Sequence, residues 1–115
     1  MFLDINKISR NKRRSIMNIS KVQNGTELCI SLEGRLDTTT SPQLEAEIKQ
    51  SLDNVDSLIF DLGKLEYVSS AGLRVLLLAQ RTMNKKQGKL VLKNVSEAVK
   101  EVLDLTGFSS IMKIQ

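Results

Sequence analysis

The sequence predicts an α/β domain with a small, mixed, mostly parallel β-sheet, an N-terminal β-hairpin and helices packed chiefly on one face. First, two kinds of segment alternate along the chain. In one, apolar and polar residues alternate, and in the other the apolar residues recur at helical spacing. Second, strands that are joined through helices pair in parallel with right-handed crossovers. Third, each strand is apolar on one side and mixed on the other, whereas a sheet covered on both faces has continuously apolar strands. We therefore expect the main helices to cover one face.

The first two predicted strands form a hairpin. A first strand is expected over residues 18–23, and Asn24-Gly25 is a strong two-residue hairpin signal that leads into a second strand over 26–33. The buried side of that second strand is expected to carry Leu28, Ile30 and Leu32. A turn over 34–37 follows.

Two helices flank the central strand. The first is expected over 40–52, with Pro42 in its first turn and an apolar stripe of Leu44, Ile48 and Leu52. The central strand alternates Leu58, Phe60 and Leu62 with polar or outward positions. A second helix is expected over 71–87, closed by Gly88 as a left-handed cap.

The C-terminal part adds one helix and two strands. A strand is expected over 89–93, and either Asn94 or Ser96 caps a helix over about 95–105. Gly107 ends that helix. A last short strand is expected over 110–114.

Composition excludes several function classes. The 115 residues suffice for one domain, and the sequence contains one cysteine and no histidine. Catalysis by Ser/His/Asp or Cys/His groups and histidine-containing zinc sites are therefore excluded, and we expect no enzyme, no metal and no cofactor. Aromatic residues make up only 3%, so we expect no nucleic-acid partner. No run is long and apolar enough for a membrane span or a signal peptide, which predicts a cytoplasmic protein without a membrane partner.

The net charge of +4 comes from the N-terminus. Residues 1–16 hold five basic residues and one acidic residue, and the remainder holds twelve of each. We expect a flexible, basic extension over 1–16 followed by a domain over 17–115. The alternative is that the extension is a basic anchor for nucleic acid or anionic lipid.

The central strand leads into its helix through two hydroxyls, Ser69 and Ser70. Serine is a preferred helix N-cap because its oxygen accepts a hydrogen bond from a free backbone N–H. Residues 67–76 around these serines resemble the signature of STAS domains, the bacterial anti-sigma-factor antagonists. Segments 32–37, 89–94 and 102–108 agree with the pattern of that family in order and spacing, and the resemblance covers about 17–115.

The resemblance implies a phosphorylation-switched binding module. Its phosphorylated serine falls on Ser70. Many members carry aspartate where this chain has Ser69, so this chain has two adjacent hydroxyls and Ser69 is the alternative site. Unphosphorylated, the module captures a kinase-type anti-sigma factor, and a serine phosphatase restores this form. The alternative function is a STAS module that binds a nucleotide or small ligand, or a subunit of a lipid-transport or signalling assembly. Simple capping by both serines is the structural alternative for the loop.

The helical spacing around the serines predicts a contact surface. Gly72, Val75, Leu76, Ala79 and Met83 share the face expected to be buried. Leu73 and Leu77 are expected on the opposite side, where they form either an exposed partner-binding patch or a site covered by a neighbouring loop. Asp37 and Asp61 are expected to converge on the same end of the sheet as Ser70. The predicted partner-binding residues are Asp37, Ser69, Ser70, Leu73, Arg74 and Leu77.

Overall fold

The computed structural model describes residues 16–115. The prediction for the extension 1–16 therefore lies, apart from Ile16, outside the described residues. The elements in chain order are β2 (Met17–Asn24), β3 (Glu27–Leu36), α2 (Ser41–Ser51), β4 (Ser57–Val68), α3 (Ser70–Lys85), β5 (Lys89–Lys93), α4 (Glu97–Thr106), the 3₁₀ turn η1 (Phe108–Ser110) and β6 (Lys113–Ile114).

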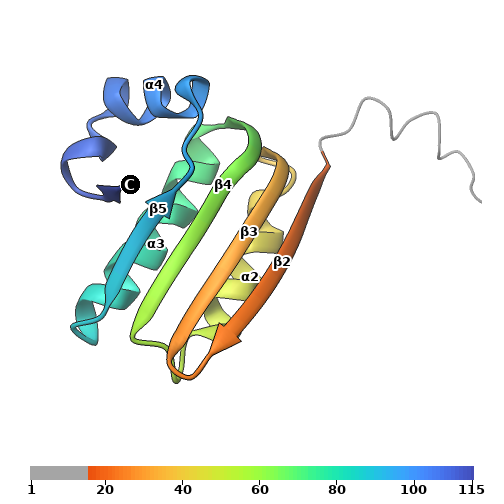
Figure 1. The fold of residues 1–115 in the computed structure, drawn as a ribbon. Coiled ribbons are helices and arrows are strands. Elements are labelled where there is room, and N and C mark those ends of the chain that lie inside the picture. The colour runs from red at the N-terminus through yellow and green to blue at the C-terminus, as the bar shows by residue number, and fades with distance from the viewer. Residues whose placement is uncertain (1–15) are drawn as a thin grey trace, which may run out of the picture.

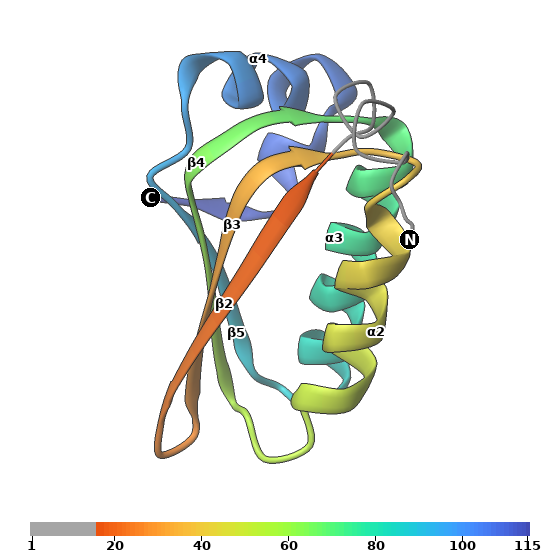
Figure 2. The same cartoon turned by 90° about the vertical axis from the view of Figure 1, so that its right-hand side faces the viewer.

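The sheet has five strands in the order β2-β3-β4-β5-β6. β2 runs antiparallel to β3, and every other neighbouring pair is parallel. Figure 1 shows this order, with β4 in the middle of the sheet. In Figure 2, turned by 90°, α2 and α3 lie side by side on one face, α4 lies at one end of the sheet, and the opposite face is left open. The predicted fold class is confirmed.

The core lies between the sheet and the two helices. The alternating residues of β3 and β4 that were expected to face inward are at most 2% exposed, as are Leu44 and Ile48 of α2. The five residues predicted for the inner face of α3 are all buried as well. Burial of apolar side chains is the main stabilising contribution in such a domain. The largest fully buried side chain is Phe60 of β4.

The hairpin differs from its prediction in two details. Its loop is Gly25-Thr26, because Asn24 already pairs with Glu27 in the ladder, and Gly25 has a positive φ of 62°. The predicted turn over 34–37 is wrong at its start, since β3 continues to Leu36 through register shifts that mark a bulge. Gly34 makes this possible: its φ is 108°, and a Cβ there would lie 2.2 Å from the carbonyl oxygen of Ile16.

The end of α3 also differs from its prediction. The left-handed residue is Gln87, with a φ of 59°, and Gly88 is not in that conformation. A glycine is required at position 88 for a different reason: an added Cβ would lie 2.6 Å from Met83 Cε and 2.9 Å from the carbonyl oxygen of Asp56. The cap of α4 follows one of its predicted alternatives, because Ser96 Oγ accepts from the N–H of Val99. Gly107, with a φ of 84°, ends α4 as predicted.

Candidate functional site

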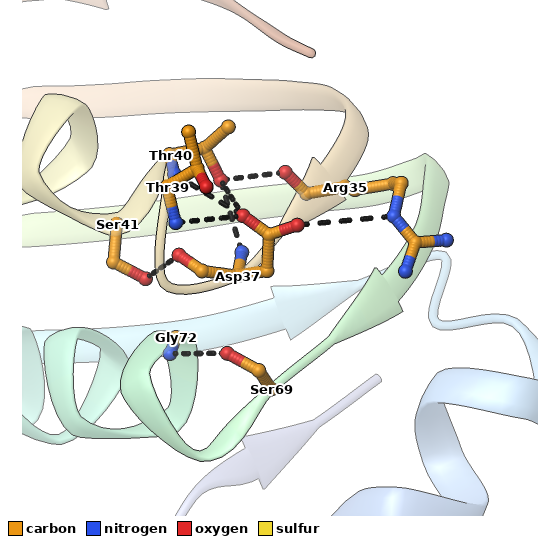
Figure 3. A network of polar contacts seen from close by, with 7 residues as sticks. All are labelled: Arg35, Asp37, Thr39, Thr40, Ser41, Ser69 and Gly72. Carbon is orange, nitrogen blue, oxygen red and sulfur yellow. Dashed lines mark hydrogen bonds and ion pairs between the residues drawn. The ribbon is translucent and has the colours of Figure 1, made fainter. Parts of the chain in front are cut away.

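The two serines between β4 and α3 have different structural roles. Ser69 is the N-cap: its hydroxyl accepts a hydrogen bond from the N–H of Gly72 at 3.3 Å, and its own N–H donates to the carbonyl of Leu36 at 2.9 Å. Ser70 is the first residue of α3 and is exposed. Figure 3 shows the Ser69 hydroxyl turned toward the first turn of the helix. The expectation that both hydroxyls could cap the helix is therefore met by Ser69 alone.

The junction between β4 and α3 is closely packed around Gly72. A Cβ on this residue would lie 2.7 Å from Leu36 Cγ and 2.8 Å from the Leu36 carbonyl oxygen. The end of β3 therefore touches the first turn of α3 directly. This contact holds the serine loop against the sheet and leaves Ser70 on the outside.

Substituting Gly72 by alanine is expected to lower the free energy of unfolding by about 1–3 kcal/mol, because the added methyl overpacks a site bounded by backbone. Urea denaturation followed by circular dichroism measures this loss. Gly63→Ala is the matched control, since its Cβ would come no closer than 3.3 Å to any neighbour. Equal stabilities of the two variants would show that the junction has more room than the structure indicates.

Asp37 organises the loop between β3 and α2. Its Oδ1 accepts hydrogen bonds from the N–H groups of Thr39 (3.0 Å) and Thr40 (3.2 Å), and its Oδ2 lies 3.8 Å from Arg35 Nε. Figure 3 shows this network beside the Ser69 cap. The structure thus brings the loop of Asp37 next to the serine loop, through the bond between Leu36 and Ser69. The carboxylate itself is engaged with the start of α2.

Three residues near the serine loop were missed by the sequence reasoning. The Arg35 guanidinium lies 4.4 Å from the ring centroid of Tyr67, a cation–π contact between adjacent strand ends. Thr40 is only 5% exposed, and its hydroxyl donates to the carbonyl of Arg35 at 2.7 Å. The run of three threonines after Asp37 was the available signal, because hydroxyl residues there favour local turns. Tyr67 had no comparable signal.

Asp61 does not join the serine loop, contrary to expectation. It lies within β4 opposite Ser31, about 16 Å along the strands from Leu36, which pairs with Val68 beside Ser69. A hydrogen bond from Asn94 (3.1 Å), followed by one from the N–H of Gly63 (3.0 Å), holds the pKa of Asp61 below its ordinary value. Its carboxylate therefore has a local structural role on the open face of the sheet.

Replacing Asn94 by glycine is expected to raise the pKa of Asp61, because it removes the hydrogen bond that lowers this pKa most, while glycine keeps the left-handed backbone of Asn94. Stabilisation from a lowered carboxyl pKa is present above the unfolded-state pKa and is lost as the pH falls through the folded-state pKa. The variant should therefore lose less stability on acidification. Carboxyl ¹³C NMR titration measures the shift. The pKa of Asp104, lowered by Ser109 and Lys100, is the internal control. An unchanged pKa of Asp61 would contradict the assignment.

The outer side of α3 carries the rest of the predicted site. Arg74 is exposed one turn after Ser70, and Leu77 is half-buried in a shallow groove between α2 and α3 that Arg81 also lines. We call Ser70, Arg74, Leu77 and Arg81 the α3 surface. No acidic residue occurs in α3, although Glu45 of α2 lines the same groove, so the α3 side of the groove is basic and partly apolar.

Leu73 was expected on the same outer side, and that expectation is wrong. Leu73 is 5% exposed and belongs to the hydrophobic core. Viewed down the helix axis at 100° per residue, the buried residues of α3 span about 160°, with Val75 at one edge and Leu73 at the other. It is this wide because α3 packs beneath the sheet and beside α2, while Met112 from the C-terminal segment joins the same core.

The described residues show two absences. Within 16–115, no three histidine, cysteine, aspartate or glutamate side chains are grouped so that they could hold a metal ion. No helix in this part of the chain is both long and apolar enough to span a membrane.

The fold and the site define a class: a small mixed-sheet domain that presents an exposed serine where its central strand enters a helix. Residues 18–115 match the family model of the STAS domain. The chain belongs to the STAS domain family.

Sequence relatives point to the same family, and solved structures share the fold. The chain is 40% identical over 88 residues, 76% of each protein, to BtrV of Bordetella bronchiseptica, a candidate anti-sigma factor antagonist by name. It is 30% identical over 104 residues to the anti-sigma-B factor antagonist of Listeria monocytogenes, covering 86% of this chain and 90% of that one. An anti-sigma factor antagonist from Mycobacterium paratuberculosis shares the fold with a TM-score of 0.77 at 23% identity, over 86% of this chain and 85% of that one. Unphosphorylated SpoIIAA shares it with a TM-score of 0.69 at 20% identity, over 87% of each.

Proposed function

We propose that this protein is an anti-sigma-factor antagonist whose partner binding is switched off by phosphorylation of Ser70. The observation that carries the proposal is the division of roles between the serines. Ser69 uses its hydroxyl to cap α3, whereas Ser70 is exposed at the first helical position. The names of the curated relatives support the same function. The site of action is the cytoplasm, where sigma factors work.

The proposed partner is a kinase-type anti-sigma factor that contacts the α3 surface and the adjoining loop of Asp37. Kinase activity transfers the γ-phosphoryl group of ATP to Ser70 Oγ, which loses its proton, and ADP leaves. The phosphate adds nearly two negative charges. The helix N-terminus tolerates this charge because its free N–H groups and dipole favour anions. The domain therefore stays folded, while a partner that had closed over Ser70 is repelled.

A serine phosphatase would reverse the switch by hydrolysing the phosphoserine to serine and inorganic phosphate. Ser70 is accessible to such an enzyme because its side chain is exposed. Ser69 is half-buried and engaged in the cap, so it is the poorer substrate for both enzymes. The domain over 17–115 carries every residue in this proposal.

The experiment is phosphotransfer with the cognate kinase and ATP, followed by mass spectrometry of the peptide that contains both serines. Phosphate on Ser70, absent in Ser70→Ala and retained in Ser69→Ala, is the expected result. Phosphate on Ser69 alone would move the site by one residue and contradict the assignment of roles. Phosphate on neither serine would overturn the switch in favour of a ligand-binding module or an assembly subunit.

A further inference from the structure

The face of the sheet opposite α2 and α3 carries a continuous apolar row. Val22, Cys29, Ile59 and Val91 are direct partners in successive strands from β2 to β5. Val22 is 61% exposed and the other three are half-buried. Figure 2 shows that no described element covers this face. Single exposed apolar residues are ordinary, but four in one cross-strand row form a contiguous patch. We call these four residues the open-face row.

Charges flank this row with opposite signs on its two sides. Glu27 on β3 and Lys89 on β5 share one row, because each pairs with Ser57 on the central strand. Lys93 adds positive charge on β5, and Lys113 on β6 pairs with Val91, so it ends the row itself with a positive charge; both lysines are exposed. The face is therefore acidic on one side of β4 and basic on the other, with the apolar row crossing between them.

We propose that the open face binds a second copy of this chain, with a two-fold axis running along β4. A two-fold contact is isologous: both copies use the same surface, so every contact between two different residues occurs twice. With the axis along β4, β3 of one copy lies over β5 of the other, and β2 lies over β6, so that Val22 meets the aliphatic part of Lys113. Glu27 then faces Lys89 in two identical pairs, and Ile59 packs on its own counterpart with the sheets about 10 Å apart.

The charge pattern selects this axis over the alternative. A two-fold axis across the strands would place Lys89 over Lys93 of the second copy, and juxtaposed like charges are unfavourable. Asp61 meets its own counterpart in the proposed arrangement. It lies on the axis, two residues from Ile59 on the same strand, where it accepts hydrogen bonds from Gly63 and Asn94 and pairs in the sheet with Lys93. The proposed axis thus has one contact between like charges, beside a lysine of each copy, whereas the alternative has two. Because the row holds only four apolar residues, we expect a small contact and a weak dimer, with a Kd of about 10–100 μM.

Sedimentation velocity of the full chain from about 5 to 500 μM brackets that range and tests the proposal. Ile59→Lys should leave the protein monomeric throughout. Glu27→Lys and Lys89→Glu should each weaken dimerisation about tenfold or more, and the double exchange should restore it to within about threefold of wild type. Ile111→Lys, at an exposed position outside the sheet, is the control and should dimerise as wild type does.

A wild-type chain that stays monomeric at all these concentrations would overturn the proposal. Single charge reversals that weaken the dimer without rescue in the double exchange would overturn the two-fold axis along β4. Circular dichroism of each variant separates lost dimerisation from lost folding. The outcome is independent of the proposed switch, because neither Ser70 nor any other residue of the α3 surface takes part.

Discussion

Replacing Ser70 by aspartate is expected to weaken capture of the anti-sigma partner by about 2 kcal/mol or more, which is about thirtyfold in Kd, without loss of the fold. The carboxylate places negative charge where the partner is proposed to close. The same carboxylate suits the first turn of a helix, where it adds a few tenths of a kcal/mol to about 1 kcal/mol of stability. The partner is first purified from the source cell by its affinity for the immobilised, unphosphorylated protein. Isothermal titration calorimetry with this partner then measures the binding loss.

Two matched variants separate the switch from the cap. Ser70→Ala should bind the partner constitutively, resist phosphorylation and unfold as wild type does, because Ser70 does not cap the helix. Ser69→Ala should lose about 0.5–2 kcal/mol of stability with the capping bond, while remaining a substrate for the kinase. If Ser70→Asp bound as tightly as Ser70→Ala, charge at this position would not control the partner.

Replacing Leu73 by arginine is expected to destabilise the domain by about 3 kcal/mol or more and to unfold much of it at 37 °C. The substitution removes a core side chain, which costs about 2–5 kcal/mol. It also brings a charge without a partner into apolar surroundings. Guanidinium denaturation followed by circular dichroism measures the loss.

The matched variant Leu77→Arg, one turn further along α3, should change stability by less than about 1 kcal/mol. Leu77 is half-buried in a groove that Arg74 and Arg81 already line, so an added guanidinium can reach water. It should still weaken partner capture, because it removes apolar area from the α3 surface. Comparable stability losses in the two variants would show that the face assignment of α3 is wrong.

The sequence was sufficient to locate the serine loop, but not to assign a role to each residue around it. Ser69 and Ser70 both precede the helix expected from the sequence and both have the chemistry of a cap, so local pattern alone leaves the choice open. The choice depends on which N–H each hydroxyl meets, and that follows from the bond between Ser69 and Leu36, residues 33 positions apart. Asp61 shows the same limit, because its distance from the serine loop depends on how far β4 extends beyond it.

By itself the sequence determined the order of strands and helices, the hairpin, the inner stripes of α2 and α3 and the position of the serine loop. These features follow from residue spacing and from the backbone preferences of glycine, proline and serine, which act locally. Only the tertiary structure decided that Leu73 is buried, that the Asp37 carboxylate turns toward the start of α2, and that four apolar residues align across the open face. Those outcomes depend on which distant segments pack together, because burial and pairing are properties of neighbours in space.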